Sequence, residues 1–421
     1  MQITRIKAAN FYGIKNPIEI SFIEGGEKEK VGYLNNGNQR ISLINGFYGS
    51  NASGKSTLLN VIDVMNRLMI NRFPMVSQGA ILDSYILLPN YCKDMHLKPT
   101  EMEMDFVLGK DIYGYMIHIR DGKDVDVEVL RKNGKQLFSR KGMEVLFNDD
   151  ILKRIGSISK NIVAPKSASF LSVLLDDASD VSVFGNMKEL IGVAELTKLK
   201  DSFCFITDKR SVERGQGNLQ GLLSVSLKYL RNSNEAEKEQ YITRISNAAS
   251  FFEPKLRRLI IRQDGQNSVR ATGEYEDFYN ELPMTEFSAG TRELISYIDD
   301  ILQMLKVGGV LVYDETSKYY HPDMENLILN LFKNKNINTK SAQIFFSSHN
   351  HETFDLLYND QAYILEKDED MEVTAHRVSD YDIEERDNKK KKYRLGVLGG
   401  VPDTIEFNRI INNLLHDKNT I

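Results

Sequence analysis

The sequence of 421 residues has only two cysteines and no long apolar run. Cys92 and Cys204 stand far apart without the spacing of metal ligands, so we expect two reduced thiols rather than a disulfide framework or a zinc site. No stretch approaches the roughly 18 consecutive apolar residues that a bilayer-spanning helix needs. The first residues read as a strand and a turn, without the apolar core of a secretion signal. These absences predict a cytoplasmic protein.

A strong charge of one sign, sustained heptads and internal repeats are also lacking. The net charge is −5, with 27% charged and 41% hydrophobic residues, which is ordinary for a globular protein. Such a balance gives no general attraction to nucleic acid or to anionic membranes. Because no heptad pattern is sustained, long coiled-coil arms are excluded. The chain is long enough for two or three domains with an ample core.

A glycine-rich segment, Gly49 to Thr57, follows a strand pattern and precedes a helical one. It reads GSNASGKST and fits the pattern G-x-x-x-x-G-K-[ST], in which glycines let backbone N–H groups wrap around phosphate. Lys55 would reach the β- and γ-phosphates of ATP, and the Ser56 hydroxyl would hold Mg²⁺. A glycine-rich turn with an exposed lysine is the alternative, which the flanking strand and helix disfavour. The predicted nucleotide-binding residues here are Gly49, Ser50, Asn51, Ala52, Ser53, Gly54, Lys55, Ser56 and Thr57.

An acidic pair, Asp314 and Glu315, follows the apolar run GGVLVY. The run predicts a buried strand of a parallel sheet, and ligands bind at the carboxyl ends of such strands. We expect Asp314 to position Mg²⁺ and Glu315 to act as the general base that orients the attacking water. Acidic strand ends are common, so this interpretation depends on the phosphate loop being present in the same chain.

A second small-residue segment, Ser288-Ala289-Gly290-Thr291, begins a helical pattern. A serine hydroxyl and free N–H groups at a helix start can bind an anion, although an ordinary serine cap is the simpler reading. One ATP does not need two helix starts from such distant places, whereas two subunits facing each other do. Ser288 and Gly290 are therefore predicted to contact the nucleotide held by a second copy of the chain.

With these motifs the chain resembles the ABC-type ATPases, in which a serine-glycine signature of one subunit closes over the γ-phosphate held by another. The resemblance implies ATP and Mg²⁺ as cofactors and a homo-oligomer with paired sites. His349, in SSHN, matches the switch histidine of these enzymes, with His351 as the nearby alternative. The glutamine expected after the first helix is not evident, and Gln78 is the nearest candidate.

Within the ABC-type ATPases, the chain is most similar to soluble members from bacterial defence islands. These are related to the OLD family and include the ATPase subunits of PARIS-type and Rlo-type anti-phage systems. The resemblance implies an antiviral ATPase that senses a phage trigger and regulates a toxic effector. Since OLD proteins continue into a nuclease domain and this chain ends at Ile421, we expect a separate effector, such as a nuclease. The segments that carry the resemblance are AANFYGIKN, YGSNASGKSTLL, SAGTREL, DETSKYYHP, SSHN and KKKKYRLGVLGGVP.

The expected fold is α/β, an ABC-type P-loop ATPase domain with a largely parallel central sheet and an insertion. Residues 1–120 form the first half of this domain and residues 281–421 the second half. Residues 121–280 form the insertion, which mixes helices with a β-hairpin that turns at Asp264-Gly265.

Two other functions stay open. A DNA-maintenance ATPase would grip DNA itself, through the mildly basic insertion, densest at KLRRLIIR, or through Lys389 to Lys392. The simpler reading is a solvated hairpin face for the first segment, and a solvated loop rather than a phosphate clamp for Lys389 to Lys392. In a regulatory module, nucleotide binding alone would matter and turnover would be incidental.

Overall fold

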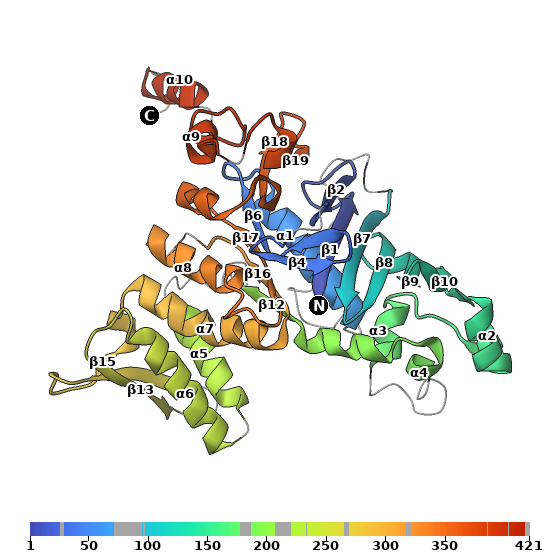
Figure 1. Ribbon diagram of the computed structural model, residues 1–421, viewed down its shortest axis with the longest axis horizontal. Coiled ribbons are helices and arrows are strands. Elements are labelled where there is room, and N and C mark those ends of the chain that lie inside the picture. The colour runs from blue at the N-terminus through green and yellow to red at the C-terminus, as the bar shows by residue number, and fades with distance from the viewer. Residues whose placement is uncertain are drawn as a thin grey trace.

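The computed structural model describes residues 1–25, 29–70, 95, 97–176, 187–206, 220–232, 234–264, 269–316, 318, 321–384, 386–402 and 404–416. Two large sheets lie on either side of one helix, and a third, smaller layer lies beside them (Figure 1). Among the described residues, no helix is long and apolar enough to cross a membrane.

The central sheet confirms the predicted α/β fold with largely parallel strands. Its six strands lie in the order β12-β16-β17-β6-β18-β19, and every pair is parallel except the β18–β19 hairpin at one edge. The inner strands are apolar and fully buried, as expected for a parallel sheet covered on both faces. The strands are β6 (Ile44–Tyr48), β12 (Phe203–Ile206), β16 (Val310–Tyr313), β17 (Gln343–Ser347), β18 (Ala362–Lys367) and β19 (Val373–Arg377).

The second large sheet is antiparallel and has seven strands in the order β11-β10-β9-β8-β7-β1-β2. Burial alternates along β8, so one face of the sheet packs on the core. A small sheet, β3-β5-β4, accompanies it. These strands are β1 (Gln2–Ala9), β2 (Ile18–Ser21), β3 (Ile23–Gly25), β4 (Tyr33–Asn36), β5 (Gln39–Ser42), β7 (Thr100–Leu108), β8 (Asp111–Arg120), β9 (Asp124–Lys132), β10 (Lys135–Lys141) and β11 (Glu144–Phe147).

Helix α1 (Lys55–Ile70) lies between the two sheets and packs on β1, β7, β16 and β17. Its apolar residues follow helical spacing, as the sequence predicts. All of them up to Met69 are at most 3% exposed, so the helix that begins at the phosphate loop is fixed by the main core. They include Leu58, Leu59, Ile62, Met65 and Met69.

Helices α7 (Ala289–Val307) and α8 (Pro322–Lys333) belong to the core on the other face of the central sheet. Ser288 caps α7 at its start, and Gly308, in the left-handed region at φ 71°, ends it. The His321 side chain caps α8, where Pro322 occupies the first turn.

The smaller layer, at the lower left of Figure 1, has its own core between α5 (Gln220–Arg231), α6 (Glu235–Ala249) and the sheet β13-β14-β15. The predicted hairpin is confirmed as β13 (Leu256–Gln263) and β14 (Val269–Tyr275), while Gly265 of its turn lies outside the described residues. Strand β15 is Leu282–Pro283.

The remaining α-helices are α2 (Asp149–Ile155), α3 (Phe170–Leu175), α4 (Met187–Ile191), α9 (Lys389–Arg394) and α10 (Thr404–His416). Short 3₁₀ helices span Gly156–Asn161, Ala194–Asp201, Met284–Glu286, His351–Leu356, Asn359–Gln361 and Val378–Asp380. The run Lys389 to Lys392, read as a solvated loop, is instead the start of α9. Its lysines have partners within the chain: Lys389 donates to the Leu357 carbonyl, and Lys390 and Lys392 pair with Glu352 and Asp387.

The predicted division at residues 120 and 280 stays a prediction, and two features of the sheets bear on it. Strands β8 and β9, on either side of residue 120, pair along most of their length. Strand β12 lies in sequence inside the expected insertion but forms the edge of the central sheet beside β16. The segment 121–280 therefore contributes to both large sheets as well as to the smaller layer.

Candidate nucleotide-binding site

The phosphate loop joins β6 to α1 and depends on two glycines with positive φ. Gly49 has φ 152° and Gly54 has φ 101°. A Cβ atom on Gly49 would lie 2.4 Å from the Leu365 carbonyl oxygen, and one on Gly54 would lie 2.6 Å from Val373 Cγ1. Because neither neighbour leaves room for a side chain, the loop curves tightly over β18 and β19 only with glycine at both positions.

Lys55 is 6% exposed, and its ammonium lies over the loop. Its Nζ donates to the carbonyl oxygens of Gly49 at 2.9 Å and of Ser50 at 2.8 Å. Burial lowers the pKa of Lys55, while the carboxylates of Asp314 and Glu315 act in the opposite direction. The two acidic residues therefore lie close enough to influence the loop lysine, as the sequence predicts for one shared site.

The acidic pair is held by one hydroxyl at the end of the neighbouring strand. Ser347 Oγ, at the end of β17, donates to Asp314 Oδ1 at 2.5 Å and accepts the backbone N–H of Glu315 at 2.7 Å. Glu315 itself has φ 57°, which is uncommon for a residue with a side chain. Sequence reasoning gave Ser347 no role, although it is the first residue of the SSHN segment.

His349 follows β17 and lines the same pocket as the phosphate loop. Burial, then Lys55 and His351, lower its pKa, and Asp314 opposes them. The imidazole is therefore neutral at neutral pH, where one ring nitrogen can donate and the other accept. The alternative, His351, contacts the Tyr393 ring at a centroid distance of 5.1 Å and does not line the pocket.

The pocket that these residues line has a volume of about 420 Å³, within the range of sites for small ligands. Sequence reasoning did not find Gly13, Lys367 and Val373 as part of it. Gly13 lies in the segment AANFYGIKN, but no local pattern places the ends of the β18–β19 hairpin beside the loop. The lining residues are Gly13, Asn51, Ala52, Ser53, Gly54, Lys55, Ser56, Thr57, Glu315, His349, Lys367 and Val373.

The pocket suits a phosphate group and a small hard cation. The buried Ser53 hydroxyl has no hydrogen-bond partner in the described part of the chain, and a phosphate oxygen would supply one. The Ser56 hydroxyl and an Asp314 carboxylate oxygen are oxygen ligands of the kind that Mg²⁺ binds, and phosphate and water would complete its coordination shell. Across the described ranges, no group of three or more His, Cys, Asp or Glu residues is arranged to hold a metal ion. This donor set fits a nucleotide-bound Mg²⁺ rather than a metal held by protein alone.

The predicted signature lies outside this pocket within its own chain. Ser288 Oγ accepts the N–H of Thr291 at 3.1 Å, so Ser288 acts as a helix cap, and its side chain is exposed. The Thr291 hydroxyl donates to Glu253 at 3.0 Å, which ties the start of α7 to the smaller layer. Gln78 lies outside the described residues.

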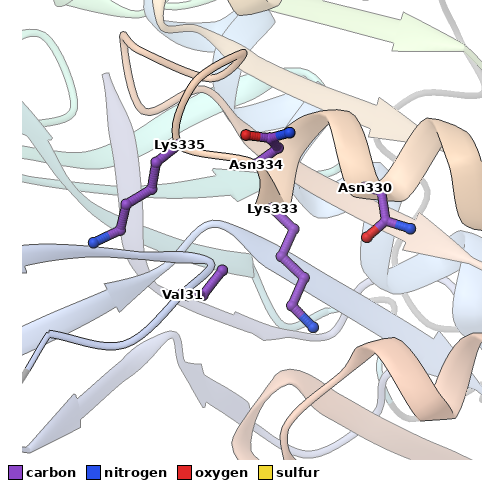
Figure 2. Close-up of a pocket in the computed structure, with 5 residues that line it drawn as sticks. All are labelled: Val31, Asn330, Lys333, Asn334 and Lys335. Carbon is purple, nitrogen blue, oxygen red and sulfur yellow. The ribbon is translucent and has the colours of Figure 1, made fainter.

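Another hollow, of about 480 Å³, lies near the end of α8 and beside Val31. Figure 2 shows the side chains of Lys333 and Lys335 on either side of Val31. Lys333 donates to the Leu356 carbonyl at 2.6 Å, and Lys335 pairs with Glu29 at 2.9 Å. None of the predicted site residues lines this hollow.

Comparison with known families decides the wider relationship. A family model described as "AAA domain, putative AbiEii toxin, Type IV TA system" matches residues 44–355. The chain belongs to this AAA-domain family. The matched span includes the phosphate loop, the acidic pair and His349, and the protein is an ATPase of the AAA type.

Among solved structures, the SMC head domain from Thermotoga maritima matches with a TM-score of 0.40 and 11% sequence identity, covering 90% of this chain and 99% of that chain. A search of curated proteins found no match.

The C-terminal segment of this AAA-family chain packs directly behind the phosphate loop. The Tyr393 hydroxyl donates to the Gly400 carbonyl at 3.0 Å, and the Gly400 N–H donates to Glu366 at 2.9 Å. Gly400 has φ 69°, and a Cβ atom there would lie 2.7 Å from Ile364 Cγ2 and 3.3 Å from Gly49 Cα. The segment YRLGVLGGVP, cited above as a family resemblance, therefore supports the loop from behind.

Replacing Gly400 by alanine should weaken ATP binding, because the added methyl group displaces β18 or Gly49. We expect the affinity for a fluorescent ATP analogue to fall about tenfold. Gly396→Ala is the matched control, since Gly396 also has a positive φ, 76°, but a Cβ atom there would meet only Val401 Cγ2, at 3.3 Å, and no backbone atom. Equal affinities for the two variants would contradict a supporting role for Gly400.

Proposed function

We propose that this chain hydrolyses ATP with Mg²⁺ in the pocket formed by the phosphate loop, Glu315 and His349. The observation that carries the proposal is that these three elements, distant in sequence, line one cavity beside the buried Asp314. In the proposed complex, Lys55 exchanges its contacts with loop carbonyls for the β- and γ-phosphates. Backbone N–H groups at the start of α1 add further donors.

Each acidic residue has a distinct role in this proposal. Ser56 and Asp314 would hold Mg²⁺, and the bound ion would neutralise part of the negative charge of the phosphates. Glu315 takes a proton from the attacking water and orients that water toward the γ-phosphate. His349, neutral at neutral pH, donates a hydrogen bond to the γ-phosphate oxygen. The Ser347 hydroxyl holds the Asp314 carboxylate and the backbone N–H of Glu315.

The signature supports a composite site between two copies of the chain. Ser288 is exposed at the start of a long helix, and neither it nor Gly290 lines the pocket of its own chain. In the proposed homo-oligomer, both residues close over the γ-phosphate that the partner holds.

We further propose that ATP turnover regulates a separate effector, such as a nuclease, in response to a phage trigger. The description of the matched family refers to a toxin of a type IV toxin–antitoxin system, and the defence-island resemblance agrees with it. In the part of the chain that the structure describes, no carboxylate or histidine cluster offers a second catalytic metal site.

Direct DNA binding is less well supported. The basic hairpin of the smaller layer pairs three of its arginines with nearby acids: Arg258 with Glu239, Arg262 with Glu281, and Arg270 with Asp264. These pairs offset the positive charge that phosphate binding would use.

The ATPase proposal predicts that Glu315→Gln retains ATP binding and loses turnover. The change removes the base but leaves the phosphate loop intact, so we expect kcat to fall by a factor of about 10² to 10⁴. Phosphate release measures turnover, and titration with a fluorescent ATP analogue measures binding. Turnover close to that of the wild type would remove Glu315 from its assigned role.

The composite site predicts complementation between two inactive variants. Lys55→Ala lacks the ammonium group that contacts the phosphates. Ser288→Arg places a large side chain where the γ-phosphate held by the partner must bind. A heterodimer of the two has one site with both residues intact, and should regain up to about half of the wild-type rate. Differently tagged chains, co-expressed and purified through both tags, provide the sample. If a crosslink between Cys residues placed at Ser50 and Thr291 forms only within one chain, the composite arrangement is wrong.

The effector proposal predicts a stable partner encoded with the chain. Purification of the tagged protein from its native locus should recover a second protein that degrades nucleic acid when released. Lys55→Ala should change the amount recovered, because the nucleotide state controls the association. Recovery of the chain alone, in both wild-type and variant form, would contradict this proposal.

A further inference from the structure

Glu325 is an acidic residue on the apolar face of α8. It shares this face with Ile328, Leu329 and Phe332, all buried in the core beside the central sheet. Its own exposed fraction is 1%. A carboxylate at such a position is costly unless its oxygens are hydrogen-bonded, so its partners indicate what it does.

The partners of Glu325 come from two separate loops. The Thr316 hydroxyl donates to Oε1, and Asn350 Nδ2 donates to Oε2 at 2.8 Å. The Ser348 hydroxyl is a third donor, and its Oγ also accepts the Asn350 N–H at 2.9 Å. Burial raises the pKa of Glu325, and these donors oppose the rise.

Both loops carry residues of the proposed active site. Thr316 directly follows Glu315, and Ser348 and Asn350 flank His349 on either side. The Thr316 N–H also donates to the Ser347 carbonyl at 3.0 Å. Glu325 therefore adds side-chain hydrogen bonds between two segments that a backbone hydrogen bond already joins. A left-handed backbone such as that of Glu315 persists only where its surroundings hold it.

We propose that Glu325 is a positioning residue that fixes Glu315 and His349 relative to each other by bridging the two loops that carry them. The inference rests on the proposed ATPase function, since neither residue has a reaction to serve without it. Glu325 does not line the pocket, so it acts on catalysis only through Thr316, Ser348 and Asn350.

The first test separates turnover from binding. Glu325→Ala should lower kcat about 100-fold, because small displacements of catalytic groups have effects of this size, while the affinity for ATP stays within about threefold. Glu325→Gln keeps one acceptor oxygen and the side-chain volume, so it should recover kcat to within about tenfold of the wild type. Thr316→Val should lower kcat less than Glu325→Ala, and adding it to Glu325→Ala should cause little further loss.

Asp323→Asn is the matched control. Asp323 lies in the same first turn of α8, but its side chain is 83% exposed. This variant removes the same helix-start charge without touching either loop, so its kcat should match that of the wild type. An equal loss in Asp323→Asn and Glu325→Ala would show that helix-start charge, not bridging, matters. Joint loss of ATP binding and turnover in Glu325→Ala would show a structural role only. Either result overturns the proposal.

The second test does not need ATP hydrolysis. Hydrogen–deuterium exchange should become at least about tenfold faster at the amides of Glu315, Thr316 and Asn350 in Glu325→Ala, because the loops lose their bridge. Amides in the middle of α8 should keep their wild-type rates. If the wild-type chain hydrolyses no ATP, the proposed function fails, yet this exchange pattern still establishes the bridge. Unchanged exchange in both loops would overturn the positioning role.

Discussion

The parallel pairing of β17 with both β6 and β16 is the constraint on which the candidate site depends. Parallel strands end at the same edge of a sheet, so this pairing brings three loops together there. The loop after β6 binds phosphate in our proposal, the loop after β16 carries the acidic pair, and the loop after β17 carries His349. Ser347 then joins two of these loops with a single hydroxyl, which donates to Asp314 and accepts the backbone N–H of Glu315.

The sheet edge alone does not shape the phosphate loop, which is confined from two further directions. The β18–β19 hairpin lies against Gly54 through Val373, and the C-terminal segment lies against Gly49 through Gly400. Both contacts are so close that a methyl group would displace backbone or branched side chains. The loop is thus held in its curved form by packing with distant parts of the chain, which explains why residues near the C-terminus belong to the same structural unit as residues near position 50.

Local sequence patterns predicted those parts of the site that lie on consecutive elements, where a strand, a loop and a helix follow one another. The phosphate loop, the strand before Asp314 and the helix after Lys55 all lie where the sequence indicated, and the roles of their residues stay predictions. Contacts between distant segments were not predictable in this way, because nothing near Val373 or Gly400 indicates which loop each one meets. Glu325 did leave a signal: an acid at i relative to apolar residues at i+3, i+4 and i+7 lies on the buried face of its helix. Such an acid needs hydrogen-bond donors, and the polar residues of the neighbouring loops provide them.

Two groups of the pocket, Lys55 and His349, are placed to respond electrostatically to a bound phosphate. Lys55 is a buried cation that donates to the carbonyl oxygens of Gly49 and Ser50, and burial lowers its pKa. The same ammonium helps to lower the pKa of His349. Phosphate charge entering between them would stabilise the protonated form of both groups and raise both pKa values. By linkage, the free energy that raises the pKa of each group equals the free energy by which protonation of that group strengthens phosphate binding. The lysine and the histidine therefore respond to the phosphate together rather than as independent sites.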